Sequence, residues 1–301
     1  MNRRKIGILC LITSGALFGT SPLANYIAAM LGSNSDTFLV TRCLTSIPVF
    51  CLILLIFKIP FKMPAEGLRD GFIGSLLNTL CALMLITSYN YVGGGIATTL
   101  HFVYPVFVMV LSFIVFKANI NLIKISALIC AVGGVALISA GDENVSTFGV
   151  ILAVGSGFVY SVYILFLEHS KLNLLHPMQF GLLNSTSMTV FSFIYSSMFA
   201  KSFDISAYSA FTWLLGLVTV IAISVGAQPL FQVGVQHTDG PTGALLSTTE
   251  PITAVILGCL CMGEGMTIRK FIGCVCILSG VFLVILGESY LNRKNGSDAA
   301  A

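Results

Sequence analysis

The chain has 301 residues, of which 56% are hydrophobic and only 9% are charged, and its mean hydropathy is +0.96. A globular protein in water needs more polar surface than this composition supplies, so the sequence favours an integral membrane protein. The net charge of +3 comes from basic residues scattered along the chain, which indicates no nucleic-acid partner.

Apolar stretches of about 20 residues, the length that an α-helix needs to cross a bilayer, recur along the chain. They lie at 8–31, 36–57, 70–91, 96–116, 122–141, 147–167, 176–199, 210–233, 241–262 and 270–287. We therefore expect an all-α integral membrane protein with ten transmembrane helices embedded in a lipid bilayer. The start of the chain is compatible with a secretory signal, but nine further spans follow it. The polar segment 292–301 is expected to be a disordered tail.

Lysine and arginine residues gather on one side of the expected helices. If the N-terminus is cytoplasmic, that side holds Arg3, Arg4, Lys5, Lys58, Lys62, Arg69, Lys117, Lys124, Lys171, Arg293 and Lys294. The outer side holds Lys201, Arg269 and Lys270. By the positive-inside rule, this bias predicts a multi-pass protein of the cell (inner or plasma) membrane with both termini in the cytoplasm.

Polar side chains in the first half are concentrated in the first, third and fourth expected spans. A transport path needs polar groups that face a cavity, and the candidates are Thr20, Asn78, Tyr89, Thr99, His101 and Tyr104. Each also has a structural interpretation. Hydroxyl groups bond the carbonyl one turn earlier, a histidine acts as a neutral hydrogen-bonding partner instead of a proton carrier, and a tyrosine packs. Both interpretations stay open for each residue.

Three residues near the N-terminus suggest structural or gating roles. Gly15 and Gly19 form a Gly-x-x-x-Gly pattern, which favours close helix packing more than phosphate binding. Arg42 lies about six residues inside the second span, where its side chain either reaches out to the membrane surface or pairs with Glu250.

The second half supplies further candidates for the path. They are Tyr160, Gln228, Gln232, Ser247 and Glu250. Gln228 and Gln232 are four residues apart, so they share one face of a helix. Tyr160, like Tyr104, is either a cavity wall for an apolar or aromatic substrate or a packing residue.

Glu250 is the most unusual residue, because it lies in an otherwise apolar stretch and is followed directly by Pro251. A charged side chain at the centre of a membrane helix costs roughly 2.5–3.5 kcal/mol. We expect the charge to be offset by Arg42, by hydrogen bonds from Ser247 or its neighbours, or by a proton. The structural alternative is that the carboxylate bonds backbone groups left free around Pro251.

The sequence contains an internal repeat with an offset of 146 residues. The offset superposes Pro105 on Pro251, Gly94 on Gly240, Lys124 on Lys270 and Cys130 on Cys276. Near the start of each half the offset is 142, which superposes Ser14-Gly15 on Ser156-Gly157. Two five-helix halves, 1–143 and 144–291, are therefore expected. Because five is odd, the second half enters the membrane in the opposite sense, and inverted repeats are typical of transporters.

Several short motifs, in order along the chain, resemble the EamA family of the drug/metabolite transporter superfamily. They are Leu17-Phe18-Gly19, the intramembrane Arg42, Glu250-Pro251, Gly263-Glu264 and Gly280-Val281. The resemblance implies a ten-helix exporter or exchanger of amino acids and other small metabolites. The first half departs from the pattern, since Tyr104-Pro105 and Lys117-Ala118 replace its Glu-Pro and Gly-Glu pairs. An asymmetric site is therefore expected.

Other function classes find less support. The sequence contains no catalytic motif such as H-E-x-x-H or G-x-S-x-G, so an enzyme is not expected, and neither is a cofactor. All nine cysteines lie inside spans. Those two residues apart point in different directions, so inert thiols are a better interpretation than a metal site.

We therefore predict a secondary transporter that works by alternating access on a neutral or zwitterionic small molecule, with amino acids the leading class. A drug or nucleotide-sugar carrier of the same superfamily is the alternative. The phosphates of a nucleotide sugar call for lysine or arginine in the cavity, and the six spans expected to line it contain neither. A proton or a counter-substrate is expected as the coupled species, and the chain is expected to be a monomer or a homodimer.

Overall fold

The computed structural model describes residues 3–33, 35–92, 94–118, 121–139, 146–199, 208–263 and 266–298, and every regular element in these ranges is helical. The first half contains α1 (Arg3–Phe18), α2 (Ser21–Met30), α3 (Ser35–Ile56), α4 (Ala65–Val92), α5 (Gly94–His101), α6 (Tyr104–Phe116) and α7 (Leu122–Ser139). The second half contains α8 (Thr147–His169), the 3₁₀ helix η1 (Lys171–Leu174), α9 (Pro177–Phe199), α10 (Ala210–Thr219), the π-helix η2 (Val220–Ala227), α11 (Gln228–His237), α12 (Gly240–Leu246), α13 (Thr249–Cys261) and α14 (Ile268–Asp298).

These elements account for the ten expected spans. The first span is α1 with α2, the fourth is α5 with α6, and the ninth is α12 with α13. The eighth is α10, η2 and α11 in succession. Among the described residues, six stretches are long and apolar enough to cross a membrane by length and composition: Arg3–Met30, Thr37–Ile56, Ala65–Tyr89, Thr147–His169, Ala210–His237 and Gly240–Cys261.

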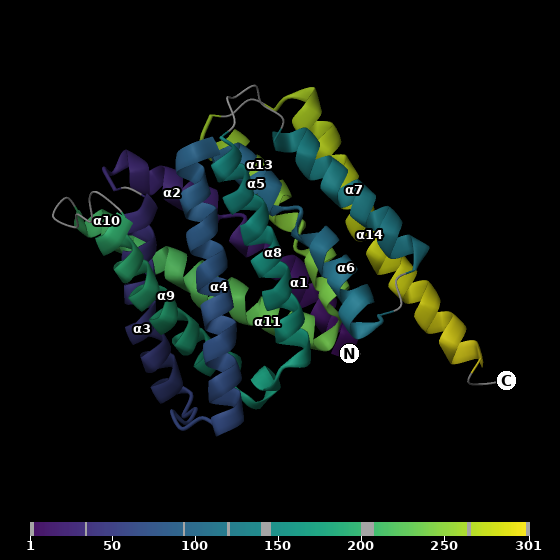
Figure 1. Ribbon diagram of the computed structural model, residues 1–301, viewed down its shortest axis with the longest axis horizontal. Helices are drawn as coiled ribbons and strands as arrows, with labels where there is room; N and C mark the ends of the chain where they lie inside the picture. Colours follow the sequence, from purple (N-terminus) through teal and green to yellow (C-terminus); the bar gives the residue numbers. More distant parts are fainter. Residues whose placement is uncertain are drawn as a thin grey trace.

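The C-terminal segment differs from the expectation of a disordered tail, because α14 continues through residues 292–298. Extending an existing helix costs much less than nucleating a new one, so a polar segment can follow an apolar helix in the same conformation. The expected boundary between the halves, at 143 and 144, lies outside the described residues. Figure 1 shows both termini at one end of the bundle, as an even number of crossings requires.

Prolines mark the places where spans are interrupted. Pro22 and Pro105 each lie at the start of the helix that follows a break, and Pro251 lies near the start of α13. A proline has no N–H to donate and clashes with the preceding turn, so the helix before it ends. Pro229 is the second residue after the π-helix η2, and the carbonyl of Ala227 at the end of η2 accepts a hydrogen bond from the Ser14 hydroxyl at 2.7 Å. Serine and threonine side chains commonly satisfy backbone groups that a proline leaves free in a membrane helix.

The two halves are inverted repeats, and their closest helix contacts reproduce the sequence offsets. A Cβ built on Gly15 would lie 3.3 Å from the Ser247 carbonyl, and one on Gly157 would lie 2.7 Å from the His101 carbonyl. His101 and Ser247 are 146 residues apart, and Gly15 and Gly157 are 142 apart. The same pseudo-twofold relation therefore links α1 and the end of α12 to α8 and the end of α5.

The pair α7 and α14 obeys the same symmetry. A Cβ on Gly134 would lie 2.6 Å from the carbonyl of Gly273, and one on Gly280 would lie 2.9 Å from the carbonyl of Ala127. Positions later in α7 contact positions earlier in α14, so the two helices are antiparallel. Figure 1 shows them side by side at one edge of the bundle.

Candidate functional site

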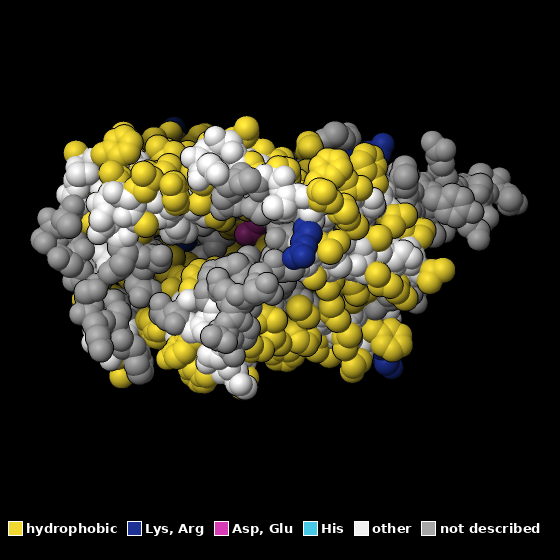
Figure 2. Space-filling model, turned by 90° about the horizontal axis from the view of Figure 1, so that it is seen from above, with side chains coloured by type: hydrophobic (Ala, Val, Ile, Leu, Met, Phe, Trp, Pro, Cys, Tyr) yellow, Lys and Arg dark blue, Asp and Glu magenta, His cyan; other side chains and the backbone are white. Residues whose placement is uncertain are grey.

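A cavity of about 210 Å³ lies at the junction of the two halves. Its polar lining consists of Arg42, Asn78, His101, Asn184, Ser185, Ser224, Gln228 and Glu250, and its aromatic lining of Phe18, Tyr104, Tyr160, Tyr163 and Phe231. Cys43, Cys81, Ala82, Leu85, Met188 and Ile223 complete it. Figure 2, a view onto the end of the bundle away from the N-terminus, shows a hollow with an acidic side chain inside it.

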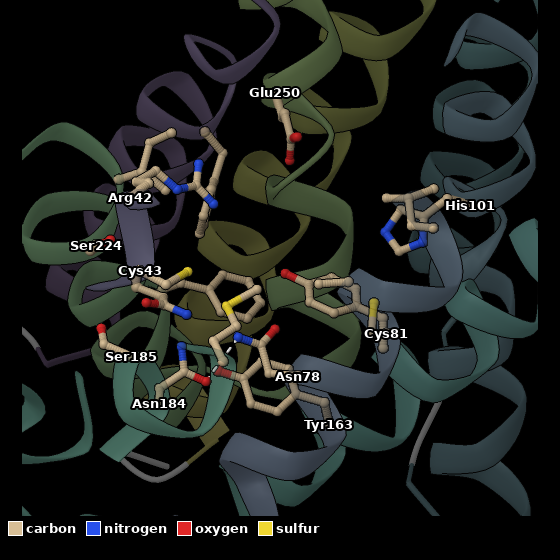
Figure 3. A pocket seen from close by; sticks show the side chains of 18 of the residues that line it. Arg42, Cys43, Asn78, Cys81, His101, Tyr163, Asn184, Ser185, Ser224 and Glu250 are labelled. Atoms are coloured by element: carbon tan, nitrogen blue, oxygen red, sulfur yellow. Dashed lines mark hydrogen bonds between the residues drawn. The ribbon is translucent and has the colours of Figure 1, made fainter. Parts of the chain in front are cut away.

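Glu250 and Arg42 bring opposite charges into this cavity. Glu250 comes from the first turn of α13, and Arg42 comes from α3 on the other side of the cavity. Figure 3 shows the carboxylate and the guanidinium both directed into the space between their helices. Among the described residues no ion pair within 4.0 Å joins them, and the buried Arg42 Nε has no hydrogen-bond partner there.

An aromatic cluster forms the part of the cavity wall next to the break between α5 and α6. The rings of Tyr104 and Tyr160 meet edge to face with centroids 4.9 Å apart, and His101 lies 5.5 and 5.4 Å from them. The Nδ1 of His101 is 2.9 Å from the Ser156 hydroxyl, which itself donates to the Ala153 carbonyl. The hydrogen bond and the ring contacts hold the imidazole in the wall of the cavity.

An amide pair lies at the opposite side of the cavity from Glu250. The Asn78 amide on α4 donates to the Asn184 carbonyl oxygen on α9 at 3.0 Å, and Asn184 is only 1% exposed. Figure 3 shows the pair beside Ser185 and Tyr163, with Glu250 at the far side. This bond uses one donor and one acceptor, so each amide keeps groups that a bound polar molecule can contact.

The cavity gathers six of the residues predicted for the path, and others lie elsewhere. Those that line it are Asn78, His101, Tyr104, Tyr160, Gln228 and Glu250. The hydroxyls of Thr20 and Ser247 instead donate to the carbonyls of Leu17 and Gly243, as membrane hydroxyl groups commonly do. Tyr89 packs with Val92 and Ala97. Gln232 is buried outside the cavity lining, and the side chain of Thr99 lies outside the described residues.

The residues assigned to structure or gating lie beside this site. Gly15 and Gly19 let α1 approach the backbone of α13, because a Cβ on Gly19 would lie 2.6 Å from the Glu250 carbonyl. Pro105 and Pro251 begin the two helices that carry Tyr104 and Glu250 into the cavity. Glu264, the acid of the Gly263-Glu264 motif, lies outside the described residues.

The six spans expected to line the cavity are an incomplete set, because α3 and α9 also line it. Arg42 and Cys43 come from α3, and Asn184, Ser185 and Met188 come from α9. Those six spans include neither α3, whose Arg42 is one charged side chain in a mostly apolar helix, nor α9, which is rich in Ser, Thr and Asn. Asn184 could have been found from the sequence, because its amide lies within a membrane span, where an unpaired polar group is costly.

Comparison with known proteins gives the lineage of this arrangement. Residues 5–140 and 147–286 each match the model of the EamA-like transporter family. The chain is similar to two Bacillus subtilis (strain 168) proteins named as uncharacterized transporters. YcbK is 25% identical over 312 residues, covering 96% of this chain and 95% of the relative. YetK is 26% identical over 252 residues, covering 78% and 74%.

A third relative and a solved structure agree with these matches. YicL of Salmonella typhimurium (strain LT2), named as an uncharacterized inner membrane transporter, is 25% identical over 225 residues, covering 71% of this chain and 70% of its own. A protein of known crystal structure superposes with a TM-score of 0.78 over 93% of this chain and 97% of that one, and its 16% identity supports the fold alone. The two matched repeats cover most of the chain, which therefore belongs to the EamA-like transporter family of membrane transporters.

Proposed function

We propose that the chain exports or exchanges a small zwitterionic metabolite, an amino acid or a close relative, by alternating access. The observation that carries the proposal is that the carboxylate of Glu250 and the guanidinium of Arg42 line one cavity and, among the described residues, form no ion pair with each other. The ammonium group of an amino acid would pair with Glu250 and its carboxylate with Arg42, so the substrate would join the two charges.

The size of the cavity supports a substrate of this class. Its volume of about 210 Å³ is below the roughly 300–1,000 Å³ that is typical of pockets for drug-sized ligands. The aromatic cluster around Tyr104 and Tyr160 would contact an apolar or aromatic side chain, and Asn78 and Asn184 would contact a polar one.

A nucleotide-sugar carrier is the second candidate, and Arg42 is the observation in its favour, because it places a cation in the cavity. A diphosphate carries more than one negative charge, whereas Arg42 is the sole lysine or arginine among the described lining residues and faces a carboxylate. Like-charge repulsion from Glu250 would oppose a polyanion. A zwitterion is therefore the better match to the two charges.

Coupling to a gradient belongs to the same proposal. An alternating-access carrier moves its substrate against a gradient only when a second species moves with it. We propose a proton or a counter-substrate, with the Glu250 carboxylate as the proton-carrying group, since it is the acid among the described lining residues of the cavity.

The experiment is a counterflow assay with purified protein in liposomes loaded with one neutral amino acid at a time. Amino acids that are transported should drive uptake of the labelled compound without ATP. Competitors that lack either the carboxylate or the ammonium group should bind at least tenfold more weakly, which corresponds to about 1.4 kcal/mol.

Variant Arg42→Gln identifies the group that binds the carboxylate. In this variant the amine competitor should become as effective as the amino acid, while the competitor with only a carboxylate stays weak. If one-charge competitors match the amino acid in the wild-type protein, or if nucleotide sugars are carried and amino acids are not, the proposed substrate class is wrong.

A further inference from the structure

A row of glutamines leads out of the cavity along one face of α11. Gln228, Gln232 and Gln236 are spaced four residues apart, so their side chains lie above one another on the helix. Gln228 lines the cavity, and Gln232 is one turn further toward the end of the bundle at which α1 begins. An apolar helix gains nothing in stability from such a row, because each amide must find partners away from water.

The second and third glutamines lack some of those partners in this conformation. Gln232 is 1% exposed, and neither its Nε2 nor its Oε1 has a hydrogen-bond partner among the described residues. The buried Nε2 of Gln236 also has none there. A buried amide without a partner is destabilising, so these side chains are expected to be better satisfied in a second conformation.

A charged network lies where the row of glutamines ends. Asp239, two residues after α11, accepts from Lys124 of α7 at 2.8 Å and from Arg4 of α1 at 3.3 Å. It also caps α12 by accepting from the Thr242 amide at 2.8 Å, and Glu168 of α8 accepts from the Gly240 amide at 2.8 Å. These contacts tie α1 and α7 of the first half to α8 and α12 of the second.

A second cavity of about 250 Å³ opens beside this network, lined by Ser112, Lys124, Glu168, His169 and Asp239 among others. The section of α11 that carries Gln232 and Gln236 therefore lies between two polar cavities. This section of α11 also packs closely against α1, since a Cβ built on Gly234 would lie 2.5 Å from the side chain of Leu11.

The network has no equivalent acid in the other half. By the repeat offset, Gly93 stands at the position of Asp239, although Lys270 stands at the position of Lys124. The repeat offset therefore gives the pair of Asp239 and Lys124 no counterpart at the equivalent positions 93 and 270.

We propose that Gln228, Gln232 and Gln236 line the half of the transport path that is closed in this structure, and that the Asp239 network is the gate that closes it. The proposal rests on alternating access, as the proposed function does, but not on any particular substrate. Opening requires the bonds of Asp239 to Lys124 and Arg4 to break, after which water and substrate supply the partners of the glutamines.

The test measures how fast a membrane-impermeant cationic methanethiosulfonate labels single cysteines in nanodiscs. Cysteines are placed at Gln232, Leu230 or Met188 in a chain whose nine native cysteines are replaced by alanine. The gate is weakened by Asp239→Asn, which keeps an N-cap oxygen while removing the charge, or by Lys124→Gln from the other half. Lys58→Gln is the matched control, because Lys58 is an exposed lysine outside the described ion pairs.

Either gate variant should raise labelling at position 232 at least tenfold and leave position 230, on another face of α11, unchanged. Labelling at position 188, inside the cavity, should fall, because opening one end closes the other. An unchanged rate at 232, or a rise at 232 without a fall at 188, would mean that the network only staples the helix ends. Hydrogen exchange of residues 232–239 in the chain with its native cysteines checks the result independently, and it should speed up in Asp239→Asn but not in Lys58→Gln.

Discussion

At the scale of single residues, Glu250 combines a high cost of burial with a position that stability alone does not explain. Among the described residues, no hydrogen bond or ion pair involves its carboxylate, and Ser247 donates to a backbone carbonyl instead. Scaffold carboxylates in membranes normally have such partners. The free carboxylate therefore fits a group reserved for a ligand.

We predict that Glu250→Gln lowers transport of a zwitterionic substrate at least tenfold while the thermal midpoint stays the same or rises. The substitution keeps the size and hydrogen-bonding capacity of the side chain and removes its charge. Initial counterflow rates and thermal unfolding of the same preparations are the two measurements. Wild-type rates in this variant would place Glu250 among the residues that only support the backbone around Pro251.

The glycine of the Gly263-Glu264 motif is explained by a left-handed backbone conformation that recurs at the equivalent helix end of the first half. Gly263 follows α13 with φ of 70°, and Lys117 ends α6 with φ of 51°. The two positions differ by the repeat offset, so the first half keeps the turn but has lost the glycine. A side chain in this region costs about 1–2 kcal/mol relative to glycine.

Lys117→Gly should therefore raise the free energy of unfolding by about 0.5–1 kcal/mol, part of the gain being offset by the greater freedom of glycine in the unfolded chain. Gly263→Ala, at the equivalent position, should lower it by about 1 kcal/mol. Denaturant unfolding in detergent measures both. If both substitutions changed the free energy of unfolding in the same direction, the equivalence of the two left-handed positions would be contradicted.

At the scale of helices, the α7–α14 pair lies apart from the cavity, and none of the described lining residues comes from it. Its close approach depends on Gly134 and Gly280, whose absent side chains let each backbone contact the other helix. Packing of this kind is the usual source of helix association in a bilayer, where there is no hydrophobic drive between helices.

Adjacent glycines of α7 give a matched test of this packing. Gly134→Ala should destabilise the protein by about 1–3 kcal/mol, because its Cβ would lie 2.6 Å from a backbone oxygen that cannot move away easily. Gly133→Ala should be neutral or slightly stabilising, since nothing lies within 4 Å of its Cβ and alanine favours a helix. Thermal unfolding of both variants decides, and a similar loss in each would indicate a propensity effect.

The helix ends joined by Asp239 should make stability depend on pH. Burial alone would raise the pKa of Asp239, but the charge and hydrogen bond of Lys124 and the bond from the Thr242 amide together hold that pKa below its usual 3.8. Arg4, Glu168 and His169 are the other charged or titratable groups nearby. A carboxylate with a lowered pKa stabilises the fold above its unfolded value and loses that contribution as the pH falls through its folded value.

We therefore expect the difference in thermal midpoint between wild type and Asp239→Asn to be constant above about pH 5 and to shrink below about pH 4, since the unfolded pKa of an aspartate is near 3.9. Scanning fluorimetry from pH 3 to 7 measures it. Lys58→Gln should show no such trend. A difference that grows as the pH falls would contradict the sign of the pKa shift.

At the scale of the whole molecule, the repeat was readable from the sequence and the lining of the cavity only in part. Aligned pairs such as Pro105 and Pro251 persist because both halves need the same break, so the offsets predicted the symmetry that Gly15 and Gly157 display in their contacts. The position of Arg42 in the cavity depends on how α3 packs against α9 and η2 of the other half, which no local pattern encodes.

Two serines show the same limit of prediction from sequence, because equivalent patterns lead to different positions in the structure. Ser247 and Ser224 are both polar residues on interrupted spans, yet only Ser224 lines the cavity, whereas Ser247 bonds its own helix. The sequence gives both residues the same two options, and the choice follows from which face of the helix the break at Pro251 or the π-helix turns inward. Sequence therefore predicts the set of candidate residues better than their roles.

The orientation of the whole molecule in the membrane is the remaining prediction. Both termini lie at the end of the bundle that carries Arg4 and Lys124, and the positive-inside rule assigns this end to the cytoplasm. A fluorescent protein that matures only in the cytoplasm should be bright when it is fused to the C-terminus. A reporter enzyme that is active only outside should be inactive there and active when it is inserted after Lys201. A dark C-terminal fusion in a protein that inserts at the normal level would reverse the orientation, and the Asp239 gate would then close the outer half of the path.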